Sequence, residues 1–523
     1  MTDDLTSRRR RLKRLALAAT AAALALTLAA CSSGGSGSTG SSGSSSDGGV
    51  YTLGLQEPDS TINPLTTSDY NAMFLVGLAS EGLLSQDAKG KLEGRLAKSW
   101  KASSDGRTWT VTLRDGLEFS DGSALTSKDV VATFESIIGK DSQSPGKSSF
   151  DGILSSVSAD GDTGVTFALA KPYADFPYLL TGSNTTIQPA GFSASTNWAK
   201  KPVGAGQFVL SKYSAGQGVT FTKNPKYWDA KDVDLKELDV KFFADEQAEL
   251  LAFQSGEIDQ ITSSPTVSAT LKGSEYQETE PYYNKFDGIF LDVTKAPFDD
   301  PKVREAFALA LDREAIVKTV YGGDAAVGND TTFFPSSAIQ PKGLEQREQD
   351  KSKVADLLGG KTVSFEITTL DAEKELAQVI QQQLEAVGGF TVTLKVLTSA
   401  QYYADGADTP WLNAPVTITN WAQRLPAQYI DLIYRSGAVW NASKYSNSKL
   451  ETLVDQYEST TSDSERQDIA NQIGEIEWTD LPVIVPAFAS TKIILQQRVT
   501  GTFRSGQDFP GGFDFRGIGV SSS

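Results

Sequence analysis

Two residue types are missing or nearly missing from this sequence of 523 residues. It contains no histidine, and Cys31 is its only cysteine. The absence of histidine excludes imidazole metal ligands and the histidine-activated nucleophiles of serine and cysteine hydrolases. A single cysteine excludes an intramolecular disulfide and leaves no thiol after residue 31.

Positive charge is also scarce. The chain has 48 Lys and Arg against 65 Asp and Glu, which gives a formal net charge of −17. Residues 1–30 hold six cations and two acids, a net charge of +4, so removing them leaves −21. Such an acidic surface repels phosphate backbones, and we therefore expect no nucleic-acid partner.

Long apolar runs are confined to the N-terminus. Residues 8–14 are basic, and residues 15–30 form an unbroken apolar or small stretch that ends in Leu28-Ala29-Ala30-Cys31. As a helix this stretch rises about 24 Å, less than the ~30 Å of a bilayer's hydrocarbon core. We therefore predict a cleaved signal peptide over residues 1–30 rather than a transmembrane helix.

The tetrapeptide Leu-Ala-Ala-Cys resembles the lipobox of bacterial lipoproteins. The resemblance implies that Cys31 is diacylated and becomes the new N-terminus. Residues 32–49 are almost entirely Ser and Gly, a composition typical of a flexible tether. We predict an extracytoplasmic protein in which residues 31–49 are the lipidated Cys and its tether to the cell membrane.

Helix and strand signals mix through the rest of the chain. Residues 108–113 alternate apolar and polar side chains, which predicts a half-buried strand. Thr126 and Asp129 have capping-box spacing and predict a helix behind them. Because single cores stop growing at about 250–300 residues, this length predicts at least two lobes. The mixture of helix and strand signals predicts an α/β or α+β class with several sheets.

Two further segments carry boundary signals. Asp300-Pro301 predicts a helix N-terminus, and Gly322-Gly323 can end that helix. Residues 373–387 have the periodicity of an amphipathic helix, and residues 390–396 alternate like a strand. Predicted helices and strands therefore alternate along the whole chain.

A series of short motifs then resembles one known family: the dipeptide, oligopeptide and nickel class (family 5) of extracytoplasmic solute-binding proteins of ABC importers. Seven or more blocks occur in the family's order over about residues 51–490. They include Glu81-Gly82-Leu83-Leu84, Leu96-Ala97-Lys98-Ser99-Trp100, Ser104-Asp105-Gly106, Pro202-Val203-Gly204-Ala205-Gly206, Asn224-Pro225-Lys226-Tyr227-Trp228, Gln254-Ser255-Gly256-Glu257-Ile258-Asp259, Ala296-Pro297-Phe298, Leu311-Asp312-Arg313-Glu314-Ala315-Ile316 and Asn441-Ala442-Ser443-Lys444-Tyr445.

The resemblance implies two α/β lobes that close around a buried solute, the Venus flytrap or periplasmic-binding-protein-like fold, with mixed sheets. The first lobe is discontinuous and comprises residues 51–282 and 488–523, with an inserted subdomain at about 85–200. The second lobe comprises residues 287–486. The implied function is that of a non-enzymatic, monomeric lipoprotein, without a cofactor, that captures a peptide or related solute and delivers it to ABC permease and ATPase subunits.

The resemblance also locates a candidate ligand site. Peptide-binding members have an aspartate shortly after a tryptophan of the second lobe, but here Asn420-Trp421-Ala422-Gln423-Arg424 is followed by no acid until Asp431. Dipeptides with free ends are therefore expected to bind poorly, because a buried ammonium needs a counter-charge. The candidate ligand contacts are Asp59, Tyr70, Thr368, Asn420, Trp421, Gln423, Arg424 and Asn441.

Alternatives remain open at this stage. Trp421 can instead be core packing and Arg424 a surface cation, and the ligand can be an oligosaccharide or an anionic small molecule. Gly204-Ala205-Gly206 begins like a dinucleotide loop but has Val209 in place of its third glycine. Ser446-Asn447-Ser448-Lys449 fits a Ser/Lys nucleophile pattern and defines the rival class, a secreted Ser-dependent hydrolase.

Overall fold

The first large sheet is built from strands that lie near both ends of the chain. In this computed structural model, which describes residues 49–521 except 60, 272–274, 405–408 and 504–513, its order is β12-β20-β11-β1-β10-β9-β8. β1 runs parallel to β10 and β11, and the other pairs are antiparallel. The bounds are β1 (Val50–Leu55), β8 (Phe208–Ser214), β9 (Gly218–Lys223), β10 (Glu237–Phe242), β11 (Gln260–Thr262), β12 (Gln277–Glu278) and β20 (Ile493–Leu495).

Apolar side chains on alternate positions of this sheet form a core with the helix α1 (Tyr70–Ala79). Tyr51 and Leu53 of β1 are fully buried there, as expected for one face of a pleated strand. Asp69 caps α1, because its carboxylate accepts hydrogen bonds from the backbone N–H groups of the first turn. The same lobe holds α5 (Glu246–Gln254), α6 (Pro265–Thr270), the 3₁₀ turns Trp198–Lys200 and Ala230–Asp232, and the strand pair β21 (Val499–Thr500) and β22 (Gly519–Val520).

A smaller antiparallel sheet, β4-β5-β7-β6, has its own apolar core. The predicted strand is confirmed as β5 (Thr108–Leu113), and Trp109, Val111 and Leu113 are its buried side chains. The predicted capping box is confirmed at the start of α2 (Ser127–Ile138). The other elements are β2 (Leu84–Gln86), β3 (Leu92–Gly94), β4 (Ala97–Ala102), β6 (Leu154–Asp160), β7 (Gly164–Leu169), α3 (Lys147–Phe150), α4 (Phe176–Leu179) and the 3₁₀ turn Ser183–Thr185.

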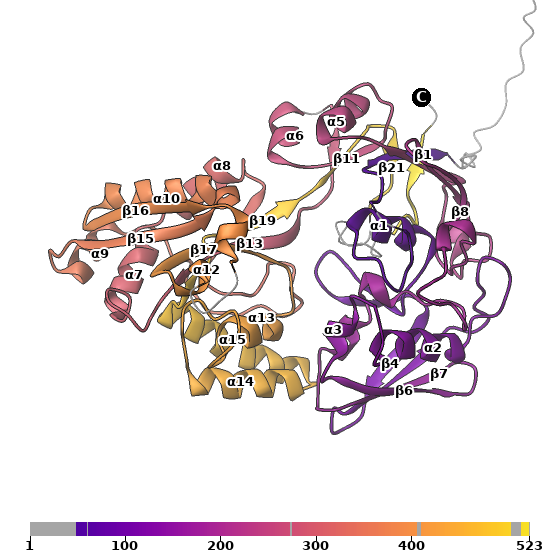
Figure 1. Cartoon of the computed structure of the whole chain (residues 1–523), viewed down its shortest axis with the longest axis horizontal. Helices are drawn as coiled ribbons and strands as arrows, with labels where there is room; N and C mark the ends of the chain where they lie inside the picture. Colours follow the sequence, from indigo (N-terminus) through magenta and orange to yellow (C-terminus); the bar gives the residue numbers. More distant parts are fainter. Residues whose placement is uncertain (1–48, 60, 272–274, 405–408, 504–513, 522–523) are drawn as a thin grey trace, which may run out of the picture. The chain divides into compact units, whose positions relative to one another are not determined.

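The second large sheet has the order β14-β19-β13-β17-β15-β16, and β18 pairs with β13. Its strands are β13 (Tyr282–Leu291), β14 (Ala325–Val327), β15 (Val363–Leu370), β16 (Phe390–Leu397), β17 (Val416–Ala422), β18 (Val483–Ile484) and β19 (Ala487–Thr491). α10 packs on β15 and β16, as Figure 1 shows. The helices are α7 (Pro301–Leu309), α8 (Arg313–Val320), α9 (Lys351–Leu358), α10 (Lys374–Val387), α11 (Ser399–Tyr402), α12 (Pro410–Asn413), α13 (Pro426–Ile433), α14 (Ser448–Ser459) and α15 (Asp463–Asp480), with a 3₁₀ turn at Asp371–Glu373.

One helix boundary differs from the prediction. Asp300 caps a helix as predicted, but that helix, α7, ends at Leu309 instead of continuing to Gly322-Gly323. Asp312 accepts a hydrogen bond from the Ala315 N–H and starts a second helix, α8. The second N-cap therefore interrupts an apolar pattern that, taken alone, is typical of one continuous helix.

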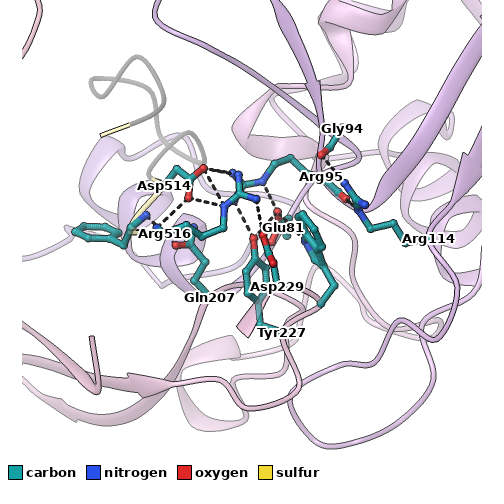
Figure 2. Close-up of polar contacts among 11 residues, drawn as sticks. Glu81, Gly94, Arg95, Arg114, Gln207, Tyr227, Asp229, Asp514 and Arg516 are labelled. Atoms are coloured by element: carbon teal, nitrogen blue, oxygen red, sulfur yellow. Dashed lines mark hydrogen bonds and ion pairs between the residues drawn. The ribbon is translucent and has the colours of Figure 1, made fainter. Parts of the chain in front are cut away.

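The last described residues return to the first large sheet through a buried ionic network (Figure 2). Asp514 receives hydrogen bonds from Arg95 at 2.8 Å and from Arg516 at 2.6 Å. Arg95 also pairs with Glu81, and Arg516 pairs with Asp229 at 2.9 Å. Because all of these side chains are buried, the network ties the C-terminal segment to the start of the smaller sheet. The two large sheets contain both parallel and antiparallel strand pairs and alternate with helices along the chain, which confirms the predicted α/β class with mixed sheets.

Candidate functional site

A cavity of about 290 Å³ lies where residues after β17 meet residues around α4. We call it the Arg424 cavity. From the second lobe it is lined by Gln423, Arg424 and Arg466. From the smaller sheet's region it is lined by residues that include Gln86, Asp175, Tyr178 and Thr181. It therefore brings together side chains that are far apart in the sequence, as ligand sites commonly do.

Gln423 is held in place from three sides. Its backbone N–H donates to the Asn284 carbonyl at 2.7 Å, and its Nε2 donates to Ser336 Oγ at 3.0 Å. The hydroxyl of Tyr282, at the start of β13, donates to Gln423 Oε1. This amide is thus pre-oriented by neighbours at the wall of the cavity, which lowers the cost of ordering it on a ligand.

Arg424 is the cation of this cavity that has no counter-charge. Among the described residues it makes no ion pair, and its Nη1 donates to the Ala422 carbonyl at 3.2 Å. Its guanidinium carbon lies 5.9 Å from the ring centroids of both Trp421 and Tyr429. A half-buried guanidinium with N–H donors to spare is suited to a carboxylate or phosphate.

The other cation of the cavity is already neutralised. Arg466 of α15 donates to a carboxylate oxygen of Asp175, which precedes α4. Both side chains are buried. Burial raises the pKa of Asp175, and the neighbouring Arg466 opposes that rise. Asp175 and Arg466 line the cavity from its two sides and neutralise each other. Arg424 is therefore the cavity's cation that can attract an anion.

Three of the other predicted contacts are buried away from this cavity. Trp421 is 5% exposed and packs against Phe290, with ring centroids 5.8 Å apart. Asn441 uses its amide within its own loop, donating to the Tyr445 carbonyl at 2.7 Å and accepting from Ser443 Oγ at 2.9 Å. Thr368 is 2% exposed within β15. In this structure Trp421 packs in an aromatic core, Asn441 forms hydrogen bonds within its own loop, and Thr368 is buried in the sheet.

The remaining predicted contacts lie at separate places. Tyr70 begins α1 and lines a cavity of the first lobe near Gln56 and Glu249. Asp59 is exposed, and its backbone N–H donates to Asp69 at 2.7 Å. Asn420 projects from the other face of β17 than Trp421, and its Nδ2 donates to Glu373 at 2.6 Å. The structure thus brings Gln423 and Arg424 together, but not the whole predicted set.

Glycines at 204 and 206 have a packing role. The Gly206 N–H donates to the Ala79 carbonyl at 2.9 Å, and a Cβ placed on Gly204 would lie 2.1 Å from that oxygen. Such close approach of two backbones requires glycine. The dinucleotide-loop pattern is therefore explained by the end of α1.

The other enzyme-like motifs also have structural roles. Asn447 caps α14 by accepting from the N–H groups of Lys449 and Leu450. Ser446 Oγ lies 2.5 Å from Ser436 Oγ. Within the described ranges, no group of three or more Asp, Glu, Cys or His side chains is arranged to hold a metal ion.

The N-terminal predictions fall outside the described residues. The signal peptide, the tether and Cys31 all belong to residues 1–49, of which only Gly49 is described. Among the helices that are described, none combines the length and apolarity needed to cross a bilayer.

The two sheets, the discontinuous first lobe and the cavity between them define the class of two-lobed solute-binding proteins. A sequence model described as bacterial extracellular solute-binding proteins, family 5 (middle region), matches residues 91–441. Because the match covers more than half of the chain, this protein belongs to that family. It is accordingly an extracytoplasmic solute-binding protein that serves transport and is not an enzyme.

Curated relatives cover most of this chain. The oligopeptide-binding protein OppA of Bacillus subtilis (strain 168) is 25% identical over 501 residues, 86% of this chain and 89% of the relative. The glutathione-binding protein GsiB of Escherichia coli (strain K12) is 25% identical over 449 residues, 81% of this chain and 86% of the relative. The resemblance to family 5 expected from the motifs is confirmed.

Solved structures share the fold. The murein tripeptide-binding protein MppA, in an unliganded open form, superposes with a TM-score of 0.81 at 17% identity and covers 91% of this chain and 98% of its own. The ABC transporter substrate-binding protein CtaP of Listeria monocytogenes gives 0.74 at 25% identity, covering 91% of this chain and 100% of its own. The predicted two-lobed fold class is confirmed.

Proposed function

We propose that this chain is the substrate-binding lipoprotein of an ABC importer that captures a peptide or related small solute between two lobes and delivers it to the permease. The lobes are residues 51–282 with 488–523, including the inserted subdomain at about 85–200, and residues 287–486. The first set of residues, with Val50 before it, holds every strand of the first large sheet, which supports the first lobe. The second large sheet runs from Tyr282 of β13 to Thr491 of β19, so it extends a few residues beyond both ends of residues 287–486. The names of OppA and GsiB favour a peptide or peptide-like solute.

The observation that carries the solute class is the lone charge of Arg424. Asp431, the first acid after Trp421, pairs with Arg435, so it supplies no counter-charge to Arg424. Asp175 is likewise committed to Arg466. A solute carboxylate is therefore the fitting partner for Arg424, with Gln423 as a neutral hydrogen-bonding neighbour. An oligosaccharide, the second candidate, has no comparable group for this cation.

A matched pair of ligands tests this. We would screen tri- to pentapeptides with free carboxylates by thermal shift, and repeat each hit with its C-terminal amide. Binding at 100-fold excess over Kd adds about 2.7 kcal/mol to the stability. We expect the acid to bind at least ten-fold more tightly than the amide, and Arg424→Gln to abolish this preference.

Lys449→Gln removes an exposed cation of α14 and serves as the control. It should leave both affinities unchanged. Equal binding of acid and amide by the unaltered protein would exclude a carboxylate at Arg424. Stabilisation by oligosaccharides alone would favour the second candidate, and turnover of ester or amide substrates would favour the hydrolase.

Two further tests address closure and anchoring. Small-angle scattering should show a smaller radius of gyration when a saturating ligand closes the lobes. Cys31→Ser should release the protein from the membrane fraction or leave it as an uncleaved precursor. A mutant of mature size that stays in the membrane fraction would contradict lipid anchoring at Cys31.

A further inference from the structure

A second cavity, of about 420 Å³, lies on the other face of the β13–β17 strand pair from the aromatic core. We call it the Glu373 cavity. Ser263 and Ser264, which follow β11 in the first large sheet, line one side. Asp287 of β13, Tyr321 and Glu373 line the other. The cavity therefore joins the two large sheets, as a site in the cleft between lobes must.

Strand register explains why its acidic residues meet. Asp287 pairs with Asn420 across β13 and β17, so both side chains lie on one face, while the neighbouring pair Phe286 and Trp421 lies on the other. Asn420 Nδ2 then donates to Glu373 Oε1 at 2.6 Å. The carboxylates of Asp287 and Glu373 are thereby held on the same side of the sheet, with one amide between them.

Each carboxylate keeps one buried oxygen without a donor. Asp287 is 3% exposed and Glu373 is 6% exposed. Tyr321 donates to Asp287 Oδ2 at 2.7 Å, but neither Asp287 Oδ1 nor Glu373 Oε2 has a hydrogen-bond partner. A buried carboxylate oxygen left unpaired destabilises the protein, and a ligand that donates hydrogen bonds to it would remove this cost.

The surrounding charge does not balance these two groups. Lys285 Nζ lies 3.7 Å from Asp287 Oδ2 and is nearly half exposed. Asp324, on the same cavity wall, is already paired with Lys492 at 3.0 Å. Burial raises the pKa of Glu373, and the nearby charge of Asp287 adds to the rise. The cavity thus carries an excess of negative charge that an incoming cation would neutralise.

We propose that the Glu373 cavity is the subsite that receives a cationic group, a guanidinium or an ammonium, of the captured solute. The N–H groups of that cation would donate hydrogen bonds to the unpaired oxygens of Asp287 and Glu373. A guanidinium has enough N–H donors to reach both carboxylates. This inference rests on the proposed function, capture of a solute between the lobes. With Arg424 as the anion partner, it predicts that the solute carries charges of both signs.

The proposal revises one expectation from the sequence. The stretch after Trp421 lacks the carboxylate that peptide-binding members use, and the sequence therefore predicts poor binding of dipeptides with free ends. In the folded chain, Asp287 and Glu373 supply carboxylates from β13 and from the turn before α10. The amine or guanidine of a peptide would thus be received at a different place in the cleft.

A pair of small probes tests the charge requirement directly. Butylguanidinium and butylurea have nearly the same shape, but only the first is a cation. We would measure the affinity of the purified protein for each by calorimetry and by NMR shift perturbation. The expected result is binding of butylguanidinium at least ten-fold tighter than that of butylurea.

Variants locate the site. Glu373→Gln and Asp287→Asn should each weaken butylguanidinium binding at least ten-fold, and their circular dichroism should match that of the unaltered protein. Glu366→Gln, which removes an exposed carboxylate from β15, should change nothing. If Asp287→Asn fails to fold, the affinity of Glu373→Gln for butylguanidinium alone tests the cation subsite.

Equal binding of the two probes, or full binding of butylguanidinium by Glu373→Gln, would overturn the cation subsite. That failure is separable from failure of the proposed function. Peptide binding and ligand-induced compaction with normal use of Arg424 would then leave the solute-binding proposal standing.

Discussion

Asp175 and Arg466 form a buried ion pair that connects the region of the smaller sheet to α15 of the second lobe. A second contact lies beside it, because the Ala174 N–H donates to the Glu458 carbonyl at 2.5 Å. Lys171 pairs with the carboxylate of Glu458 at 2.9 Å. These contacts join the lobes at a place other than β13 and β19, the strands that lead from one large sheet to the other.

The first prediction follows from this pair. Arg466→Met leaves Asp175 without its counter-charge, which costs about 3–5 kcal/mol when the group stays buried. Separation of the lobes would return Asp175 to water at lower cost. We therefore expect a larger radius of gyration in small-angle scattering, with less than about 2 kcal/mol lost in urea unfolding. The double variant Asp175→Leu with Arg466→Met should return toward the original dimensions; unchanged dimensions in Arg466→Met would refute the idea.

A second prediction concerns Asp330, which lies inside the second lobe. It receives two hydrogen bonds from Arg313, at 2.8 and 2.9 Å, and is 2.9 Å from Arg347 Nε. Asp330→Asn keeps the shape but leaves two buried guanidiniums without an anion. We expect a loss of about 3–5 kcal/mol in urea unfolding. Asp356→Asn, an exposed change on α9, is the control and should cost less than about 0.5 kcal/mol.

A third prediction concerns pH. Burial raises the pKa of Glu477 on α15 to about 7, although Thr332 donates hydrogen bonds to both of its oxygens. Because the folded pKa lies above the unfolded one, the protonated form stabilises the fold at low pH. That stability is lost as the pH rises from about 4.5 to about 7, and its size is about 3 kcal/mol at most.

Glu477→Gln should remove this part of the pH dependence. The amide can accept from the Thr332 N–H and donate to its hydroxyl, so the variant should be more stable than the original protein at pH 8. Glu475→Gln, exposed on the same helix, should leave the pH profile unchanged. An unfolding free energy with the same slope between pH 5 and 7 in Glu477→Gln would contradict the assignment.

A fourth prediction separates packing from nucleotide binding at Gly204. A methyl group there would overlap the Ala79 carbonyl, so Gly204→Ala should cost about 3 kcal/mol of stability. Gly182→Ala is the matched control, because its Cβ would have no neighbour closer than 3.7 Å. Thermal unfolding of the two variants checks this. A Gly204→Ala protein as stable as the original would contradict the observed packing.

The sequence predicted best those elements whose signals are local. The alternation at residues 108–113 and the Thr126–Asp129 capping box correspond to β5 and to the start of α2 without error. The boundary after Leu309 was missed because the apolar pattern runs through it, although Asp312 is itself an N-cap signal. A period of 3.6 does not reveal where one helix stops and another starts on the same core.

The candidate site was only partly predictable, because it depends on tertiary packing. Gln423 and Arg424 follow β17 and line a cavity. Trp421, two residues before Gln423, lies on the other face of β17 from Asn420 and is part of an aromatic core. Asp287 carried a usable signal, a carboxylate between buried Phe286 and Ile289, but its meeting with Glu373 depends on the pairing of β13 with β17. No local pattern reports that register.

The ionic network around Asp514 affects the order in which the two lobes can finish folding during synthesis. Arg95 and Tyr227 are synthesised long before Asp514, and β1 long before β20, yet they share one lobe. The second large sheet is assembled from strands that have all been synthesised by residue 491. The first lobe is therefore the last to be completed, through contacts of large sequence separation that form slowly. A chain truncated before Asp514 would leave the buried Arg95 with only Glu81 and Tyr227 as partners, so this lobe would lack part of its ionic network.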